Sequence, residues 1–129
     1  MENLTLQEIV SKLKDLNILI VEDGVDVRNI METTFNKLFH STTVAIDGVD
    51  GLDKFTHQKP DIIITDIRMP NMSGNDMIDK IKELDPNIPI IIVSGHQRLI
   101  NKNNKADVIL NKPIKFEKLI SHIYELTQE

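Results

Sequence analysis

The sequence predicts an α/β fold in which five parallel strands form one doubly wound sheet with helices on both faces. Short apolar runs rich in β-branched residues recur along the chain, and segments with apolar residues at helical spacing separate them. Strands that are covered on both faces read as apolar runs without polar alternation. Strands that alternate with helices favour a parallel sheet with right-handed crossovers.

Three apolar runs mark the strongest strands, and two weaker segments bring the number to five. The strong runs are residues 18–21, 62–64 and 88–93, and the weaker segments are residues 42–46 and 107–110. Each is short enough for a strand and too short for a typical helix. We therefore expect a five-stranded sheet.

Helices are predicted after the first, second, third and fifth strands. Apolar residues recur at helical spacing in four groups, which are Val27, Ile30, Met31, Phe35 and Leu38; Val49, Leu52 and Phe55; Met77, Ile78, Ile81 and Leu84; and Phe116, Leu119, Ile120, Ile123 and Tyr124. Gly51 lies inside the second group, where glycine costs about 1 kcal/mol relative to alanine.

One more helix is predicted before the first strand. Thr5 and Glu8 have the spacing of a capping box, which favours a helix that starts after Thr5. We expect residues 1–14 to form a helical extension and residues 15–129 to form a single domain.

Composition narrows the classes of function. A net charge of −5 disfavours nucleic acid and anionic membranes as direct partners. The chain has no cysteine, so thiol chemistry and cysteine metal sites are excluded. Its first residues lack a signal-peptide pattern, and no apolar run is long enough to span a bilayer. We expect a cytoplasmic protein.

Polar residues follow the predicted strands at the edge of the sheet where ligands bind in doubly wound folds. They are Glu22 and Asp23, Asp66, Ser94 and Lys112. Taken singly, each has an ordinary explanation, such as helix capping, turn formation or a solvated lysine. Four such coincidences at one edge of a sheet favour a common site instead.

A chemical reason connects these residues. Three clustered carboxylates raise one another's pKa unless a cation compensates their charge, and Mg²⁺ suits a site of few carboxylates and oxygen ligands. The Lys112 ammonium and the Ser94 hydroxyl are phosphate donors. Asp66 among them is a candidate acceptor for a phosphoryl group, because carboxylates form aspartyl-phosphate intermediates.

Four segments carry a resemblance to a known family. They are Val21-Glu22-Asp23, residues 60–70 (PDIIITDIRMP) with Gly74, Val93-Ser94-Gly95, and Lys112-Pro113. These segments resemble the CheY-like receiver domain of response regulators, from about residue 17 onward. The resemblance implies a flavodoxin-like strand order of 2-1-3-4-5 and a role in two-component signalling.

The resemblance also implies how the site works. Asp66 would receive a phosphoryl group from a sensor histidine kinase or a histidine phosphotransfer protein. Asp23 and the backbone carbonyl of Arg68 would bind Mg²⁺ together with Asp66, and Glu22 would hold a metal-bound water. The protein would be a phosphoacceptor that catalyses its own phosphorylation and dephosphorylation, and not a turnover enzyme.

Two further residues receive roles from the resemblance. Ser94 would donate a hydrogen bond to the aspartyl phosphate, and Lys112 would pair with another phosphate oxygen. The peptide bond between Lys112 and Pro113 would be cis. Phosphorylation would change the conformation and so regulate an unidentified downstream protein or output domain.

The sequence departs from the family pattern in two places. Ile109 stands where the family usually has an aromatic residue that reports phosphorylation, so the usual aromatic switch cannot operate. Ser94 and Lys112 are 18 positions apart, about one helical turn less than usual. Asparagines at positions 101, 103 and 104 weaken helix formation there. We therefore expect a shortened helix between the fourth and fifth strands.

Two other functions fit part of this pattern. A phosphatase of the haloacid-dehalogenase type also forms an aspartyl phosphate, but it needs a second aspartate two positions after the first, where this chain has Arg68. A receiver fold that acts as an interaction module without phosphorylation remains an alternative, because the usual switch residue is replaced.

Overall fold

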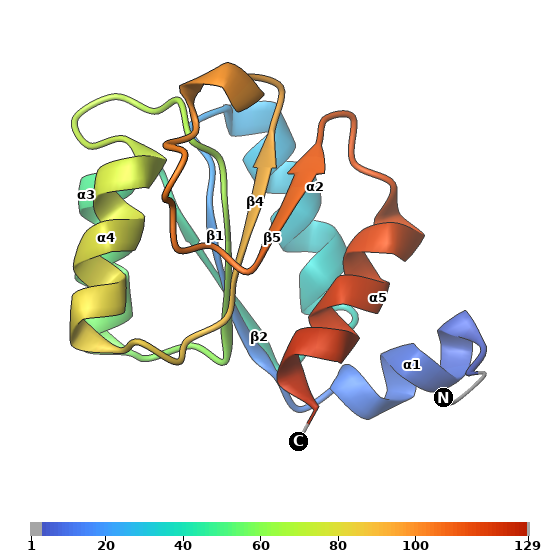
Figure 1. Ribbon diagram of the computed structural model, residues 1–129. Helices are drawn as coiled ribbons and strands as arrows, with labels where there is room; N and C mark the ends of the chain where they lie inside the picture. Colours follow the sequence, from blue (N-terminus) through green and yellow to red (C-terminus); the bar gives the residue numbers. More distant parts are fainter. Residues whose placement is uncertain (1–3, 129) are drawn as a thin grey trace.

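Five parallel strands form one sheet in the order β2-β1-β3-β4-β5 (Figure 1). This is a computed structural model, which describes residues 4–128. Residues 1–3 of the predicted helical extension and residue 129 of the predicted domain lie outside the described residues. The strands are β1 (Asn17–Val21), β2 (Ser41–Ala45), β3 (Ile62–Thr65), β4 (Ile90–Ser94) and β5 (Val108–Asn111). The predicted fold class and strand order are confirmed, with strand ends shifted by one or two residues.

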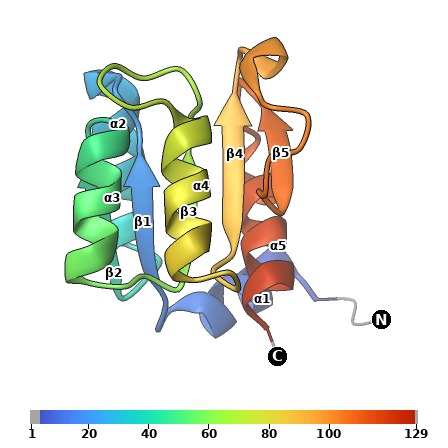
Figure 2. The ribbon, with the colours of Figure 1, turned by 60° about the vertical axis from the view of Figure 1, so that its left-hand side comes forward.

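Helices cover both faces of the sheet. They are α1 (Leu6–Leu13), α2 (Val25–Asn36), α3 (Gly48–His57), α4 (Gly74–Leu84) and α5 (Phe116–Thr127). The helices α3 and α4 lie side by side on one face, and α2 and α5 lie on the other (Figures 1 and 2). Among residues 4–128, no helix is both long and apolar enough to cross a membrane.

The predicted N-terminal helix is present and packs on the domain. The Thr5 hydroxyl accepts a hydrogen bond from the backbone N–H of Glu8 at 3.1 Å and so caps α1. Leu13, at the end of α1, is fully buried and belongs to the hydrophobic cluster that α2 and α5 form against the sheet. The helix α1 contacts α5.

The sheet separates two hydrophobic clusters. One contains Ile18 and Ile20 of β1 with side chains of α2 and α5, and the other contains Leu19 and Val21 with side chains of α3 and α4. Alternate residues of each strand thus face opposite helical layers, which is why the strands read as continuous apolar runs.

The connection between β4 and β5 departs most from regular structure. It contains only η1 (Gln97–Leu99), a single 3₁₀ turn. The expected shortening of the helix is confirmed, and it leaves a single turn. Ile100 and Ala106 of the connection pack against the cluster on the α3 and α4 side, so a loop covers this part of the sheet.

Gly51 has a packing role that its helix propensity does not reveal. A Cβ atom at this position would lie 2.6 Å from the Met77 sulfur and 2.9 Å from a Val21 methyl group. The glycine therefore allows α3 to approach α4 and β1 closely. Its cost to the helix is offset by this packing.

Candidate functional site

The ends of β1 and β3 bring three carboxylates together. Glu22 and Asp23 follow β1, and Asp66 follows β3, the neighbouring strand. One carboxylate oxygen from each lies within 4.8 Å of the other two. Glu22 and Asp66 are 6% and 7% exposed, whereas Asp23 is exposed to solvent. The cluster is thus open on the side of Asp23.

Lys112 joins this cluster from the end of β5. Its Nζ lies 2.7 Å from Asp66 Oδ2 and 3.0 Å from Glu22 Oε1. Burial alone would lower the pKa of Lys112, but the hydrogen bonds to both carboxylates and their negative charge outweigh it, so the pKa lies above its ordinary value. The side chain is therefore an ammonium beside Asp66.

Backbone N–H groups orient the carboxylates of Asp66 and Glu22, and Arg28 holds the backbone beside them. No sequence pattern indicated these contacts. The N–H of Ile67 donates to Asp66 Oδ1 at 2.6 Å, and the N–H of Gly24 donates to Glu22 Oε2 at 2.9 Å. Arg28 Nη1 donates to the carbonyl oxygens of Glu22 and Asp23. These bonds leave Asp66 Oδ2 facing the lysine.

Ser94 and Arg68 complete the set of predicted residues. Ser94 is the last residue of β4 and is fully buried, and its Oγ accepts a hydrogen bond from the backbone N–H of His96 at 2.9 Å. Arg68 lies two residues after Asp66 with an exposed side chain. The Lys112–Pro113 peptide bond is cis. The roles assigned to Ser94 and Arg68 stay predictions.

The loop that follows Asp66 is fastened to the start of α3. Asn71 has a positive φ of 67°, and its Nδ2 donates to Asp47 Oδ2 at 2.6 Å. The N–H of Gly48 donates to the carbonyl of Met72 at 3.2 Å. Hydrogen bonds from the backbone N–H of Asp50 and from Asn71 hold the pKa of Asp47 below its ordinary value.

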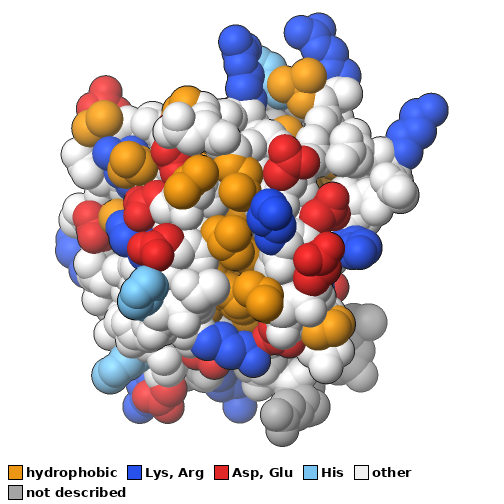
Figure 3. All heavy atoms as spheres, turned by 90° about the vertical axis from the view of Figure 1, so that its left-hand side faces the viewer, with side chains coloured by type: hydrophobic (Ala, Val, Ile, Leu, Met, Phe, Trp, Pro, Cys, Tyr) orange, Lys and Arg blue, Asp and Glu red, His pale blue; other side chains and the backbone are white. Residues whose placement is uncertain are grey.

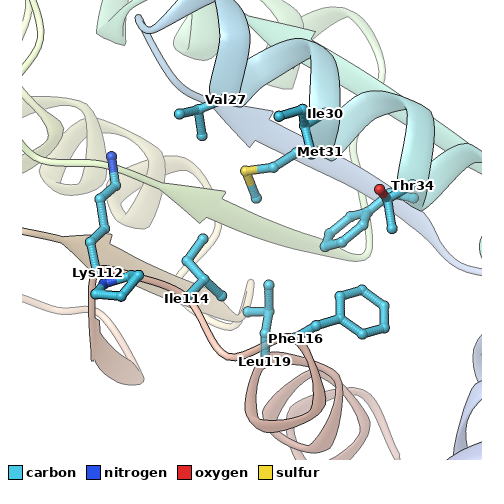
Figure 4. Close-up of a pocket in the computed structure, with 10 residues that line it drawn as sticks. Val27, Ile30, Met31, Thr34, Lys112, Ile114, Phe116 and Leu119 are labelled. Atoms are coloured by element: carbon cyan, nitrogen blue, oxygen red, sulfur yellow. The ribbon is translucent and has the colours of Figure 1, made fainter.

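An apolar groove borders the lysine end of the site. It has a volume of about 590 Å³ and lies between α2 and the segment that runs from Lys112 into α5. Val27 and Ile30 of α2 face Ile114 and Phe116 across it (Figure 4). Val27, Ile30 and Phe116 belong to predicted apolar stripes, yet they are 39%, 66% and 36% exposed. They line a surface groove and not the core.

Comparison with known sequences agrees with this geometry. A family model described as "Response regulator receiver domain" matches residues 18–124. The chain is 34% identical to sporulation initiation phosphotransferase F of Bacillus subtilis over 82 residues, which cover 64% of this chain and 66% of that protein. It is 31% identical to hybrid signal transduction histidine kinase D of Dictyostelium discoideum over 84% of this chain, but spans only 7% of that much longer protein.

Solved structures show the same architecture. A response regulator receiver domain protein (CheY-like) from Methanospirillum hungatei superposes with a TM-score of 0.78 at 26% identity, over 88% of this chain and 92% of that one. The N-terminal domain of an uncharacterized protein from Wolinella succinogenes gives 0.75 at 32% identity, over 86% and 93%. Since the match covers most of the chain and the fold and acidic cluster agree with it, the chain belongs to the response regulator receiver domain family of two-component systems.

Proposed function

We propose that Asp66 accepts a phosphoryl group from a histidine residue of a sensor kinase or phosphotransfer protein. The observation that carries this proposal is the contact of Lys112 Nζ with Asp66 Oδ2 at 2.7 Å inside a cluster of three carboxylates. In the transfer, an Asp66 oxygen forms a bond to phosphorus while the phosphorus–nitrogen bond of the donor imidazole breaks, and the electron pair stays on nitrogen. The ammonium stabilises negative charge on the transferring oxygens.

The carboxylate cluster fits Mg²⁺. Glu22, Asp23 and Asp66 offer only oxygen donors, and Lys112 compensates part of their negative charge. The Arg68 carbonyl is proposed as a further ligand because it lies in the loop that Asp47 and Asn71 fasten. When bound, the metal would supply positive charge to the phosphoryl oxygens. Ser94 is proposed to bind a phosphate oxygen after its hydroxyl leaves the N–H of His96.

Labelling from a small phosphodonor tests the acceptor. Acetyl phosphate with Mg²⁺ should add one phosphoryl group to the protein, as measured by intact mass, and none to Asp66→Asn. Asp23→Asn should fold normally, because Asp23 is exposed, and should label only at much higher Mg²⁺ concentrations. Equal labelling of the wild type and Asp66→Asn would refute the acceptor assignment.

The apolar groove is proposed as the surface on which the histidine donor rests. A donor that reaches Asp66 beside Lys112 comes to lie next to this groove, which is mostly apolar. Ile30→Ser should slow transfer from a phosphorylated histidine phosphotransfer domain but not from acetyl phosphate. Leu84→Ser is the matched control, since Leu84 is similarly exposed (63%) on α4, on the other face of the sheet.

The two alternatives give different results in these assays. A receiver fold that works without phosphorylation would take no label from either donor, although it would bind its partner unchanged. A phosphatase would turn over a general phosphomonoester such as p-nitrophenyl phosphate. We expect no such turnover, because Arg68 occupies the position at which that chemistry needs an acid.

A further inference from the structure

The charge of this domain is unevenly distributed along the chain. Residues 98–118 contain six of the fifteen Lys and Arg residues but only two of the twenty Asp and Glu residues. This segment has a net charge of +4, whereas the whole chain has −5, so the remainder carries −9. One region of an acidic protein is therefore strongly basic, and this is not required by the acidic site.

Five of these six cations have no carboxylate partner among residues 4–128. Lys112 is held by Glu22 and Asp66. The others form what we call the basic strip, which consists of Arg98, Lys102, Lys105, Lys115 and Lys118. All five are exposed, and within residues 4–128 none of them pairs with a carboxylate. In Figure 3, Lys and Arg side chains project from the upper edge, at the height of η1 in Figure 1.

The cations of the basic strip lie before and after β5 in the chain, and two of them, Lys115 and Lys118, lie beside it in space. Arg98, Lys102 and Lys105 lie on the connection that packs on the α3 and α4 side, through Ile100 and Ala106. Lys115 and Lys118 belong to the start of α5, on the opposite side. Lys115 and Lys118 therefore give the surface beside β5 a positive potential, to which the other three cations add at longer range.

β5 itself has an open edge. It pairs with β4 and with no other strand among the described residues. A strand with one neighbour directs the backbone N–H and C=O groups of every second residue outward, where another chain can pair with them. A hollow of about 340 Å³ runs beside it, lined by Ile109, Asn111, Lys115 and Lys118 among others. Ile109 is 39% exposed and supplies an apolar surface there.

We propose that the edge of β5 binds an extended acidic segment of a partner protein. The segment adds a strand to the sheet, an apolar side chain rests on Ile109, and its carboxylates pair with cations of the basic strip. Nucleic acid is a poorer fit, because the remainder of the domain carries −9 and the carboxylate cluster lies at the carboxyl end of the same sheet. The surface is exposed before any phosphorylation, so this inference does not depend on the proposed function.

Binding of labelled probes to the unphosphorylated protein tests the proposal. The probe is a ten-residue peptide of alternating Val and Glu, measured by fluorescence anisotropy at low salt. We expect Lys115→Glu/Lys118→Glu to weaken binding about tenfold or more. Lys80→Glu is the matched control, because Lys80 is an exposed lysine of α4 outside the basic strip. This variant should bind the peptide like the wild type. Circular dichroism checks that each variant is folded.

Two further probes separate the mode of binding. A peptide of the same composition with prolines replacing two valines cannot pair along an edge strand, and it should bind much more weakly. Single-stranded oligo-dT should bind no better than that peptide. Equal binding of all three probes would mean that the basic strip binds polyanions in general, and this would overturn the proposal. Absence of peptide binding, or self-association in sedimentation that buries β5 against a second copy, would overturn it as well.

Discussion

The connection after β3 and the connection after β4 leave the same edge of the sheet from neighbouring strands, yet they are held very differently. The first, residues 66–73, begins with the buried Asp66 and Ile67 and is fastened to α3 by two hydrogen bonds. The second, residues 95–107, has no α-helix and no residue that is fully buried. Leu99, its largest apolar residue besides Ile100, is 41% exposed.

The side chain of Asn75 fastens the second connection to α4. Asn75 of α4 donates from Nδ2 to the carbonyl of Leu99 at 2.8 Å and accepts the N–H of Asn101 at 3.1 Å. A segment with few buried contacts opens locally at small free-energy cost. From this difference we expect the acceptor side of the site to be the more rigid, and the side that follows Ser94 to be the part that responds to a new ligand.

Glycine-to-alanine substitutions should give the largest contrast between the two connections. Gly74 begins α4 directly after the first connection, and a Cβ there would lie 2.3 Å from the carbonyl oxygen of Asp66 and 2.9 Å from Ile67 Cα, so the backbone of the connection would have to move. A Cβ at Gly95 meets nothing closer than Lys112 Cβ at 4.0 Å. We expect Gly74→Ala to lower the free energy of unfolding by about 3 kcal/mol and Gly95→Ala to change it by less than about 0.5 kcal/mol.

Urea unfolding of both variants measures this contrast, and acetyl phosphate labelling measures its effect on Asp66. Gly74→Ala should also label poorly, because the shift acts on the acceptor's own carbonyl. Similar unfolding midpoints for the two alanine variants would mean that the first connection is not rigid, and the comparison would fail.

Removing the fastening at Asp47 should have a smaller effect, and one that depends on pH. Asp47 caps α3 by accepting the N–H of Asp50 at 2.8 Å and also accepts from Asn71. We expect Asp47→Ala to cost about 1–2 kcal/mol at pH 7. Because the folded-state pKa of Asp47 is lowered, its contribution is present above the unfolded value of about 3.9 and is lost as the pH falls through the folded value.

Thermal unfolding at pH 7 and at pH 3 checks the sign. The difference between wild type and Asp47→Ala should shrink at the lower pH. A double variant with Asn71→Ala should cost less than the sum of the two single variants, because both remove the same hydrogen bond. Additive costs, or a difference that grows in acid, would contradict the fastening.

The elements of the fold that bury continuous apolar runs were predictable from the sequence. The runs of β1, β3 and β4 are fully or almost fully buried and lie between two helical layers, so their pattern had no competing explanation. The apolar stripes of α2 and α5 predicted the helices but not which of their residues are buried. Apolar spacing does not separate a core position from a groove position such as Ile30 or Phe116. Gly51 was unpredictable in the same way, since its reason is a neighbouring helix.

The carboxylates and the lysine of the site were predictable because they follow strands that end at one edge. Their supporting contacts were not. Asp47 and Asn71 are 24 residues apart, and neither residue type alone indicates the other. Arg28 reads as an ordinary charged residue of a helix, although it donates to the backbone beside the acidic cluster. Pairings of this kind depend on three-dimensional proximity that no local pattern encodes.

A small effect on the free energy of unfolding should come with a large effect on local motion when Asn75 is replaced. Asn75→Ala removes both hydrogen bonds to the second connection, but these groups are exposed and water can replace the amide, so the free energy of unfolding should fall by about 1 kcal/mol at most. Amide exchange over residues 96–105 should become much faster, while α4 and the strands keep their protection. Asn36→Ala is the control, since Asn36 is exposed at the end of α2, on the other face of the sheet.

The same measurement with a phosphate mimic and Mg²⁺ shows whether this connection carries the signal. Ile109 cannot act as an aromatic switch, so an order–disorder change of residues 96–105 is the mechanism that the loose connection allows. If Ser94 turns from the N–H of His96 to the phosphate, exchange in this segment should slow in the wild type. Asn75→Ala should need more of the mimic to reach the same protection, because more disorder must be removed. Strong protection of residues 96–105 before the mimic is added, unchanged afterwards, would refute this mechanism and leave α5 as the better candidate for the responding surface.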